Sequence, residues 1–311
     1  MKVFHGYKNI TGIKNPVIAI GIFDGLHLGH KKVISKILSY KKQGSDSVII
    51  TFDPHPRNVL SKSKVSPRIM SLKHRLQILD KMGIDAVIVI KFTTFLAKMS
   101  PEDFVKRVLI PLSTKKVYIG ENFKFGHNKQ GDVAFFNEIG KHYGIKIYKV
   151  SPAKKYKKEI SSTWLRALIG SGKLKKARVL LNRPVSILGT VVHGDSRGKK
   201  LGFPTANLDP HQEVIPPAGV YAAKININEK FYDAVVNIGF RPTFYGIKHK
   251  REEPNIETHI FNFSKKLYGK NIEIFFITKL RDEKKFADKE LLIRQIKKDI
   301  TRAKKILTRS G

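Results

Sequence analysis

The first half of the chain alternates short apolar runs with segments of helical periodicity. Helical patterns such as Ser71–Met82 and Ser100–Leu112 lie between the apolar runs. The runs are nearly continuous in apolar character, which is typical of strands that are covered on both faces of a sheet. This alternation predicts a doubly wound parallel sheet. The five expected strands are Pro16–Ile22, Ser47–Phe52, Ala86–Phe92, Lys116–Ile119 and Lys146–Val150.

The pattern changes after about Leu181. Two helical stretches, Thr163–Gly170 and Leu174–Leu181, close the first half, and Asn182–Pro184 is interpreted as a link. Beyond the link, strand patterns are separated by turn-like stretches, and several of them alternate apolar and polar residues. This predicts an antiparallel sheet or barrel. The expected strands are Ser186–Val192, Val220–Ile227, Phe231–Ile238, Ile256–Phe261 and Ile272–Ile277. We therefore expect two domains, residues 1–182 and 183–311.

Two helices carry clear terminal signals. Ser100 is an expected N-cap, with Pro101 at the first helical position and Asp103 three residues after the cap. Asp288 is the expected cap of a helix that ends the chain. That last helix has one apolar face, formed by Leu292, Ile296, Ile300 and Leu307.

Length and composition narrow the class of protein. A chain of 311 residues suits about two domains. No apolar run approaches the roughly 20 residues needed to cross a bilayer, and Met1–Tyr7 lacks the apolar region of a secretory signal. The sequence has no Cys. This excludes disulfides, thiolate catalysis and Cys-ligated zinc, and it fits a cytoplasmic protein.

The chain is strongly basic, with 60 Lys and Arg against 25 Asp and Glu and a net charge of +35. One interpretation is an anionic partner such as nucleic acid, a membrane surface or a nucleotide. The other is a compositional bias spread over solvated faces. The basic residues occur throughout the chain and form no confined tail, which favours the second interpretation. We therefore expect no specific nucleic-acid partner and no membrane, while anionic substrates would still be attracted by this field.

The segment Gly21–His30 reads Gly-Ile-Phe-Asp-Gly-Leu-His-Leu-Gly-His, follows the first expected strand and leads into a helix. Gly25 and Gly29 let the backbone approach a ligand closely, and a helix start offers N–H donors to a phosphate. His27 and His30 add two imidazole donors, which suits a transition state with charge on phosphoryl oxygens. The two histidines could instead be metal ligands, but no third ligand is obvious nearby.

This segment resembles the HxGH motif of the nucleotidyltransferase superfamily, in the longer form GxFDGxHxGH. The second signature of that superfamily, ISSTxxR, is present as Ile160–Arg166 at a helix start, where the hydroxyl residues alone would indicate only a cap. Thr51–Pro56 and Gly120–Gly126 resemble segments of the FMN adenylyltransferase module of bacterial bifunctional riboflavin kinase/FAD synthetases. The resemblance implies that the first half is a Rossmann-like nucleotidyltransferase domain.

The resemblance also implies the chemistry, in which the FMN phosphate attacks the α-phosphorus of ATP and expels pyrophosphate. His27 and His30 would be catalytic, and Asn122 would act near the reacting phosphates. The implied ATP- and phosphate-binding residues are Gly21, Phe23, Asp24, Gly25, His27, Gly29, His30, Asn122, Ser162, Thr163 and Arg166. The chain departs from the family at Glu159, where a basic residue often precedes the ISST signature, and Lys157 and Lys158 could compensate.

The second half contains a Gly-rich polar loop, Gly189–Gly198, followed by Gly202–Asn207, which reads Gly-Phe-Pro-Thr-Ala-Asn. The Thr205 hydroxyl and the Asn207 amide oxygen are ligands of the kind that Mg²⁺ prefers and shares with nucleotide phosphates. Pro204 stiffens the turn. Taken alone, this pattern would indicate an ordinary surface turn, because turns favour the same residue types.

From about Asn182 to its end, the chain resembles riboflavin kinase, whose fold is a Greek-key β-barrel. The matching pieces, in the family's order, are Gly202–Asn207, Gly219–Tyr221, Asn237–Gly239 with Arg241–Thr243, Ile256–His259, Leu267–Lys270, and Leu280–Arg281 with Phe286. The resemblance implies that Thr205 and Asn207 bind Mg²⁺ and ATP. Glu257 would be the general base for the ribityl hydroxyl, although by pattern alone it would be a solvent-facing strand residue. The implied ATP- and flavin-binding residues are Gly202, Pro204, Thr205, Asn207 and Arg281.

Both motif sets together predict a bifunctional enzyme that converts riboflavin and ATP to FMN, and FMN and ATP to FAD. Mg²⁺ is the expected cofactor, and the oligomeric state is left open. One alternative is a chain in which only one module is active. Another is a nucleic-acid-binding protein, which would require a concentrated basic stripe with interleaved aromatic residues. A third is an adenylyltransferase for another phosphorylated metabolite, against which the kinase-like half argues.

Overall fold

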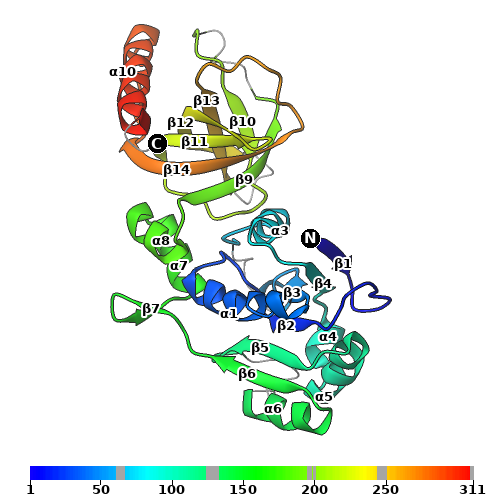
Figure 1. Ribbon diagram of the computed structural model, residues 1–311. Helices are drawn as coiled ribbons and strands as arrows, with labels where there is room; N and C mark the ends of the chain where they lie inside the picture. Colours follow the sequence, from blue (N-terminus) through cyan, green and yellow to red (C-terminus); the bar gives the residue numbers. More distant parts are fainter. Residues whose placement is uncertain (61–66, 124–132, 195–197, 199–200, 244–250, 309–311) are drawn as a thin grey trace. The chain divides into compact units, whose positions relative to one another are not determined.

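In the computed structural model (Figure 1), the described residues are 1–60, 67–123, 133–194, 198, 201–243 and 251–308. They form two compact units. The first comprises Met1–Arg68 and Leu72–Ser162, and the second comprises Ile69–Ser71 and Thr163–Gly311. The short segment Ile69–Ser71 belongs to the second unit by its contacts, since the Ser71 backbone N–H donates to Glu213 Oε1 at 2.7 Å.

The first unit is built on a six-stranded sheet in the order β1-β4-β3-β2-β5-β6, and every pair is parallel. The five expected strands are all present, and they are β2 (Val17–Ile20), β3 (Ser47–Asp53), β4 (Ala86–Lys91), β5 (Lys116–Gly120) and β6 (Lys146–Val150). The doubly wound parallel sheet predicted from the sequence is therefore confirmed.

Helices cover both faces of this sheet (Figure 1). Ile18 and Ile20 of β2 belong to a core cluster with Phe104 and Phe136, whereas Val17 and Ala19 are buried on the opposite face. Helix α1, from the other face, contributes buried Val33, Ile34 and Ile37. The helical segments of the unit are α1 (Leu28–Leu38), η1 (Lys41–Gln43), α2 (Pro56–Leu60), α3 (Leu72–Lys81), α4 (Thr94–Lys98), α5 (Pro101–Phe104) and α6 (Val133–His142).

The expected helix Ser100–Leu112 changes type along its length. Ser100 caps it as predicted, because its hydroxyl accepts from the Asp103 N–H at 3.0 Å. The helix then continues from α5 as a π-helix, η2 (Val105–Leu109), and ends as a 3₁₀ turn, η3 (Ile110–Leu112). Pro111 has no N–H to donate to an i−4 carbonyl, so regular α-helical bonding ends near this point.

Two features of the first unit have no counterpart in the sequence prediction. Strand β1 (Lys2–His5) pairs in parallel with the edge of β4, although Met1–Tyr7 shows no apolar strand pattern. Most of its side chains are exposed, so neither alternation nor a continuous apolar run marks it. A small hairpin of β7 (Lys154–Lys155) and β8 (Lys158–Glu159) precedes the ISST signature.

The second unit contains a closed antiparallel barrel in the order β10-β13-β12-β11-β14-β9. Strands β11, β12 and β13 are consecutive neighbours, and β10 lies beside β13, which is the arrangement of a Greek key. The predicted barrel is thus confirmed, with β10 added and several strands longer than expected. The strands are β9 (Val185–Val192), β10 (Ala206–Asp209), β11 (Gly219–Ile227), β12 (Lys230–Thr243), β13 (Arg251–Ile260) and β14 (Asn271–Arg281).

Three helices are seen in or leading into this unit among the residues that the structure describes. Helices α7 (Ser162–Gly170) and α8 (Leu174–Leu181) lead to the barrel, and α8 ends at Asn182 in the left-handed conformation. Helix α10 (Lys289–Thr308) lies along the outside of the barrel (Figure 1). Asp288 caps it as predicted, because its carboxylate accepts from the Leu291 N–H at 2.7 Å. Ala303 and Leu307 pack with Val220 and Leu280 of the barrel.

Candidate active sites

The first candidate site lies where the strand order of the parallel sheet reverses. From β2 the chain proceeds outward through β3 and β4 on one side, and through β5 and β6 on the other. Ligands of doubly wound sheets bind at the carboxyl ends of the strands at this switch point. Gly21 follows β2 and Asn122 lies two residues after β5, and these strands are direct neighbours with Ile20 opposite Ile119. The topology therefore brings two separate sequence motifs to one edge.

The two histidines of the first motif stack on each other. Their ring centroids lie 3.7 Å apart with an interplanar angle of 19°, and the Phe23 ring meets His30 edge-on at 5.4 Å. The loop that carries them is tightly folded, because Phe23, Gly25 and Leu26 have φ values of 54°, 90° and 43°. A positive φ at a non-glycine residue costs on the order of 1 kcal/mol. Full burial of the Phe23 and Leu26 side chains offsets this cost.

Glycines of the motif pack against these rings. A Cβ atom at Gly29 would lie 3.1 Å from the His27 ring, and one at Gly21 would lie 3.1 Å from the Phe23 ring. Both distances are tighter than ordinary van der Waals contact. The spacing of glycines and histidines in Gly21–His30 is thus a packing requirement of the folded loop, as well as a way of exposing backbone to a ligand.

The surroundings of His30 favour its neutral form. Burial lowers the pKa of His30 well below its usual range, and the neighbouring His27 and Arg75 lower it further. His30 is therefore held neutral near pH 7, with one ring N–H available to donate. A bound phosphate in contact with the ring would favour the imidazolium form instead.

Ser162 reaches the same loop from the second signature. Its hydroxyl donates to the Asp24 carbonyl at 2.9 Å, which brings the start of α7 to the histidine motif. Thr163 and Arg166 follow on α7, within the second compact unit.

Asn122 contacts the residue at which the chain departs from the family. Its side-chain amide donates to Glu159 Oε2 at 3.5 Å, and both side chains are exposed. Lys157 and Lys158 are exposed beside Glu159, and Lys158 pairs with Lys155 across the β7–β8 hairpin. The remainder of the motif that contains Asn122, Lys124–Gly126, lies outside the described residues.

Sequence reasoning missed a pair of arginines at this site. Arg75 on α3 is 4% exposed and donates through Nη1 to the Ile22 carbonyl, which also accepts from the Thr51 hydroxyl. Arg68 pairs with Asp53 at 2.6 Å. A signal for Arg75 was available, because it stands four residues before Leu79 on the buried face of α3.

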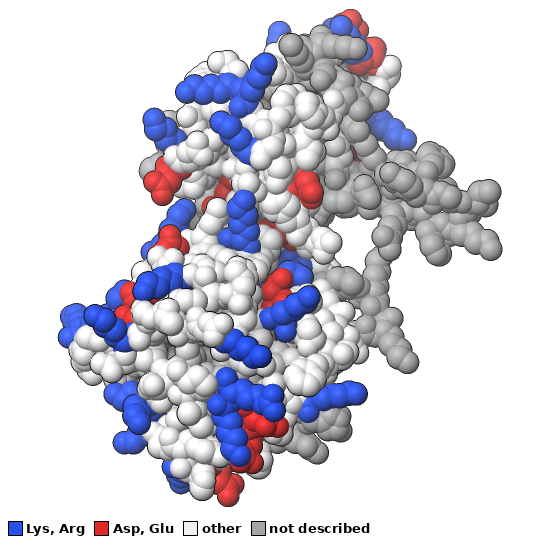
Figure 2. All heavy atoms as spheres, turned by 90° about the vertical axis from the view of Figure 1, so that its right-hand side faces the viewer, with Lys and Arg blue, Asp and Glu red and all other residues white. Residues whose placement is uncertain are grey.

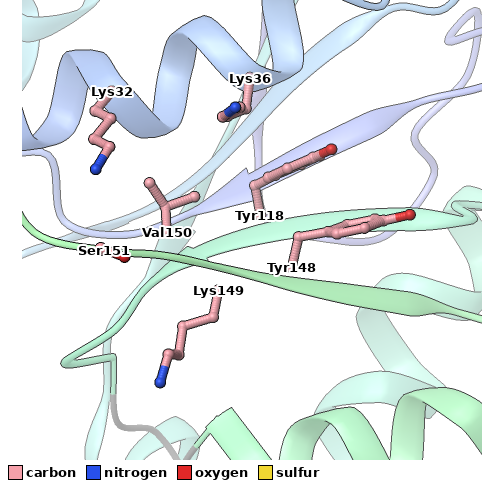
Figure 3. Close-up of a pocket in the computed structure, with 7 residues that line it drawn as sticks. All are labelled: Lys32, Lys36, Tyr118, Tyr148, Lys149, Val150 and Ser151. Atoms are coloured by element: carbon pink, nitrogen blue, oxygen red, sulfur yellow. The ribbon is translucent and has the colours of Figure 1, made fainter.

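A groove of about 320 Å³ lies elsewhere in this unit, between α1 and the edge strand β6 (Figure 3). The Tyr118 and Tyr148 rings stack there with centroids 4.8 Å apart. Lys149 is paired with Glu121 at 2.8 Å. None of the residues predicted for the site lines this groove. Its lining residues are Lys32, Lys36, Tyr118, Tyr148, Lys149, Val150 and Ser151.

The second candidate site lies on the outer face of the barrel. Asn207 of β10 stands directly opposite Glu257 of β13, which in turn stands opposite Asn237 of β12. Side chains of directly paired residues share one face of a sheet. The neighbouring Ile256 and Thr258 are buried in the interior, so Glu257 projects outward. Asn255 donates to Glu257 Oε1 at 2.8 Å and fixes the carboxylate.

The turn before β10 is tied to the same strand. His259 Nδ1 donates to the Pro204 carbonyl at 2.9 Å, and the Phe203 ring meets His259 edge-on at 5.9 Å. Gly202 has a φ of 85°, which this turn requires. The motifs Gly202–Asn207 and Ile256–His259, about fifty residues apart in sequence, are thus adjacent in the fold.

Backbone glycines pack against the two expected metal-binding side chains. A Cβ atom at Gly198 would lie 2.9 Å from Thr205 Oγ1, and a Cβ atom at Gly194 would overlap the Asn207 amide. Gly194 therefore lies directly against Asn207, and Gly198 against Thr205. Part of that loop, Asp195–Arg197, lies outside the described residues.

Arg281, also predicted for the second site, is engaged by the protein. Its Nε and Nη2 atoms each lie 2.9 Å from Asp299 Oδ2 on α10, and its Nη1 donates to the Asp282 carbonyl at 2.9 Å. Both side chains of the pair are largely buried, with 15% and 8% exposed. Arg281 thus joins the end of β14 to α10.

The wider surface adds two observations. On the face drawn in Figure 2, Lys and Arg side chains are scattered among acidic and uncharged residues and form no stripe. Within the described part of the chain, no three His, Asp or Glu side chains are grouped to hold a metal ion.

Two family models match the chain. Residues 10–164 match the FAD synthetase family, and residues 181–307 match the riboflavin kinase family. The first match contains the histidine motif and Asn122, and it ends within the ISST signature. The second contains the whole barrel.

Curated relatives match over nearly their full length. The bifunctional riboflavin kinase/FMN adenylyltransferase of Buchnera aphidicola subsp. Schizaphis graminum is 38% identical over 311 residues, which is 98% of each chain. The protein of the same name from Bacillus subtilis is 35% identical and covers 91% of this chain and 90% of its own. That of Escherichia coli K12 is 32% identical over 96% of each chain.

A solved structure is similar across both units. A protein from Streptococcus pneumoniae, described as a macrolide-efflux protein, has a TM-score of 0.85 and 27% identity, covering 98% of this chain and 99% of its own. In the part of the present chain that the structure describes, no helix is long and apolar enough to cross a membrane.

Proposed function

The chain belongs to the bifunctional riboflavin kinase/FMN adenylyltransferase family, and we propose that each of its two sites catalyses one of the two reactions. The enzyme phosphorylates riboflavin with ATP to give FMN, and it transfers the adenylyl group of a second ATP to FMN, giving FAD and pyrophosphate. The observation that carries the assignment of sites is the pairing of distant motifs in each unit. In the first unit, Ser162 donates to the Asp24 carbonyl in the loop that carries the two histidines. In the barrel, Asn207 stands opposite Glu257.

We assign residues 1–182 to adenylyl transfer and residues 183–311 to the kinase. By contacts alone, the compact units divide between Ser162 and Thr163. Helix α7 begins within the ISST signature, however, and Asn182 caps the end of α8 shortly before the first barrel strand. A functional boundary between residues 182 and 183 keeps the whole ISST signature in the same domain as the histidine motif.

Adenylyl transfer requires alignment of two phosphates and neutralisation of the charge that develops between them. His27 and His30 supply ring N–H donors, and the backbone at Gly21, Gly25 and Gly29 leaves room for phosphate oxygens. Phe23 and Asp24 hold the loop that carries the histidines. Asn122 contributes an amide from the neighbouring strand end. Ser162, Thr163 and Arg166 complete the ATP-binding set at the start of α7.

In the kinase reaction, Glu257 removes the proton from the ribityl hydroxyl as that oxygen attacks the γ-phosphorus of ATP. Its outward position, fixed by Asn255, supports this role. Gly202 and Pro204 shape the turn beside it. We propose that Arg281 contributes to the ATP- and flavin-binding surface while its guanidinium is fixed by Asp299.

Mg²⁺ is the proposed cofactor, and the residues present fit it. Thr205 and Asn207 offer a hydroxyl and an amide oxygen, and Gly198 and Gly194 pack closely against these two side chains. Few protein ligands suffice, because Mg²⁺ in nucleotide sites takes its other oxygens from phosphates and water. When bound, the ion would neutralise the charge of the transferred phosphoryl group.

The substrates are riboflavin, FMN and ATP, and we propose that the protein acts in the cytoplasm, where ATP is made. A nucleic-acid partner is the rival proposal for the charge of +35. Cations are scattered on the face drawn in Figure 2, which supports the enzyme without such a partner. A titration with DNA and RNA at increasing salt tests this point, since phosphate binding would weaken steeply with salt.

One incubation tests the proposed function. The protein is mixed with riboflavin, ATP and Mg²⁺, and the flavins are separated by chromatography over time. FMN is expected first and FAD afterwards. Absence of any phosphorylated flavin would contradict the proposal. FMN without FAD, or FAD only from added FMN, would favour the alternative in which one module is inactive.

A further inference from the structure

Arg75 is a buried cation that the reaction described above does not use. It lies on α3, where its side chain is 4% exposed, and burial lowers its pKa to about 10. Burying an arginine is costly unless the guanidinium has fixed partners. Its Nη1 donates to the Ile22 carbonyl, while its Nε has no partner among the described residues. The guanidinium is therefore directed at the main chain of the histidine loop.

The Ile22 carbonyl lies where the main chain of that loop adopts an unfavourable conformation. The next residue, Phe23, adopts a φ of 54° and is fully buried. The same carbonyl also accepts from the Thr51 hydroxyl at 3.1 Å. Two donors from two elements, β3 and α3, thus fix the peptide at which the chain turns from β2 toward His27. A backbone that must hold a strained conformation needs such external restraint.

The charges around Arg75 form one group. Asp24 and Asp53 favour its charged form, and Arg68 opposes it. Arg68 is itself paired with Asp53 at 2.6 Å. The Arg75 charge also acts on His30, whose ring is stacked on His27. Arg75 therefore interacts electrostatically with two carboxylates and with His30.

We propose that Arg75 is a positioning residue for adenylyl transfer, which holds the Ile22 carbonyl and keeps the stacked pair of His27 and His30 in register for phosphate. In this role Arg75 acts through the loop and through its charge. The inference rests on the proposed adenylyltransferase function of this site.

Two substitutions separate the roles of the guanidinium. Arg75→Met removes both the carbonyl contact and the charge, whereas Arg75→Lys keeps a charge but not the planar set of donors. For Arg75→Met we expect kcat for FAD formation from FMN to fall by about tenfold or more, with little change in KM for FMN. For Arg75→Lys we expect a smaller loss of kcat.

The protonation of His30 gives a readout that a purely structural role would not move. Because the Arg75 charge lowers the pKa of His30, its removal in Arg75→Met raises that pKa, whereas Arg75→Lys leaves it close to the wild-type position. The titration is followed by NMR of the His30 ring in the full-length protein. The limb of the pH–rate profile that depends on His30 is expected to move to higher pH in Arg75→Met alone.

The same chain provides the controls. Circular dichroism and denaturant unfolding report whether the first unit of each variant is folded, and riboflavin phosphorylation reports on the barrel. Lys73→Met removes an exposed cation from the same helix. Lys73→Met is expected to match wild type in both activities. Arg75→Met with FAD formation within twofold of wild type would overturn the proposal, as would an unshifted His30 titration. If Arg75→Met does not fold, Arg75→Lys decides, and wild-type kcat in that variant would overturn the proposal. A wild-type protein that makes no FAD would refute the proposed function instead.

Discussion

The His27 and His30 rings stack with their centroids 3.7 Å apart. Two imidazolium ions in this arrangement would repel each other strongly, so the pair favours at least one neutral ring. The neutral ring is expected to be His30, which packs against Phe23 and His27. Burial and the nearby charges of His27 and Arg75 lower its pKa. A phosphate is the kind of ligand that relieves the repulsion, because its negative charge compensates a second proton on the pair.

This arrangement predicts an acid-labile fold. The pKa of His30 is lowered in the folded protein relative to the unfolded chain, so the unfolded state binds more protons as the pH falls below the usual value of 6.5. The free energy of unfolding should therefore decrease from pH 7 toward pH 5, by no more than about 1.4 kcal/mol per pH unit for this one proton. Denaturant unfolding at a series of pH values measures the slope.

His30→Gln is the matched variant for this test, because a neutral amide of similar reach removes the titration. Its unfolding free energy should vary less with pH than that of wild type over the same interval. Equal slopes in the two proteins would mean that His30 does not carry the pH dependence.

Much of the fold could be predicted because burial on both faces leaves a simple pattern. Strands such as β2 and β4 are apolar at almost every position, and the barrel strand β11 alternates from Ala223 onward. Strand β1 could not be predicted, since its side chains are mostly exposed and it is held by backbone pairing to β4. Strand β10 is only four residues long, and Leu208 alone is buried in it.

The candidate sites could likewise be predicted from the sequence only in part. The spacing of Gly21–His30 indicated phosphate chemistry from the sequence, but the contact of Ser162 with Asp24 depends on tertiary structure. Arg75 was missed because arginines in helical patterns are usually exposed. Glu257 resembled a solvent-facing strand residue by pattern alone. Its position opposite Asn207 follows from barrel pairing between strands about fifty residues apart, which no local pattern reveals.

Loss of the Glu257 carboxylate should separate the two activities. Glu257→Gln keeps the shape of the side chain and its contact with Asn255 but cannot accept the substrate proton, so riboflavin phosphorylation should fall by about 10²–10⁴-fold. Conversion of FMN to FAD should remain within twofold of wild type. Separate assays with riboflavin and with FMN as substrate measure the two rates.

His30→Ala is the reciprocal variant of that experiment. It should lower FAD formation by about 10²-fold or more and leave riboflavin phosphorylation intact. If either substitution abolished both activities in a folded protein, the assignment of two independent sites would be wrong.

A methyl group at Gly194 should impair the kinase through Asn207. The added Cβ atom of Gly194→Ala would overlap the Asn207 amide, so the amide or the loop must shift. We expect a higher KM for Mg²⁺-ATP in riboflavin phosphorylation and unchanged FAD formation from FMN. Gly269→Ala is unsuitable as a control because its φ is 73°, whereas Gly170→Ala meets nothing within 4 Å and serves well. Equal kinase kinetics for Gly194→Ala and Gly170→Ala would refute the role given to Asn207.

The pair of Arg281 and Asp299 should stabilise the kinase unit. Asp299→Asn leaves the buried guanidinium without its carboxylate, a change that costs about 3 kcal/mol in comparable buried pairs. Gln295, which donates to Asp299 Oδ1 at 2.9 Å, would lose its charged acceptor as well. Calorimetric unfolding of the full-length protein measures the effect, and Glu290→Gln removes an exposed carboxylate from the same helix as a control.

The kinetics of Asp299→Asn decide what Arg281 does. Suppose that Arg281 binds substrate in the orientation that Asp299 imposes. At a temperature where the variant is still folded, its KM for riboflavin or ATP is then higher than that of wild type, while FAD formation from FMN is unchanged. If Arg281 serves only to attach α10 to the barrel, the melting temperature falls and both KM values remain at wild-type level. A variant as stable as Glu290→Gln, with wild-type KM values, would contradict both roles, because neither the contact of α10 nor a ligand would then depend on this ion pair.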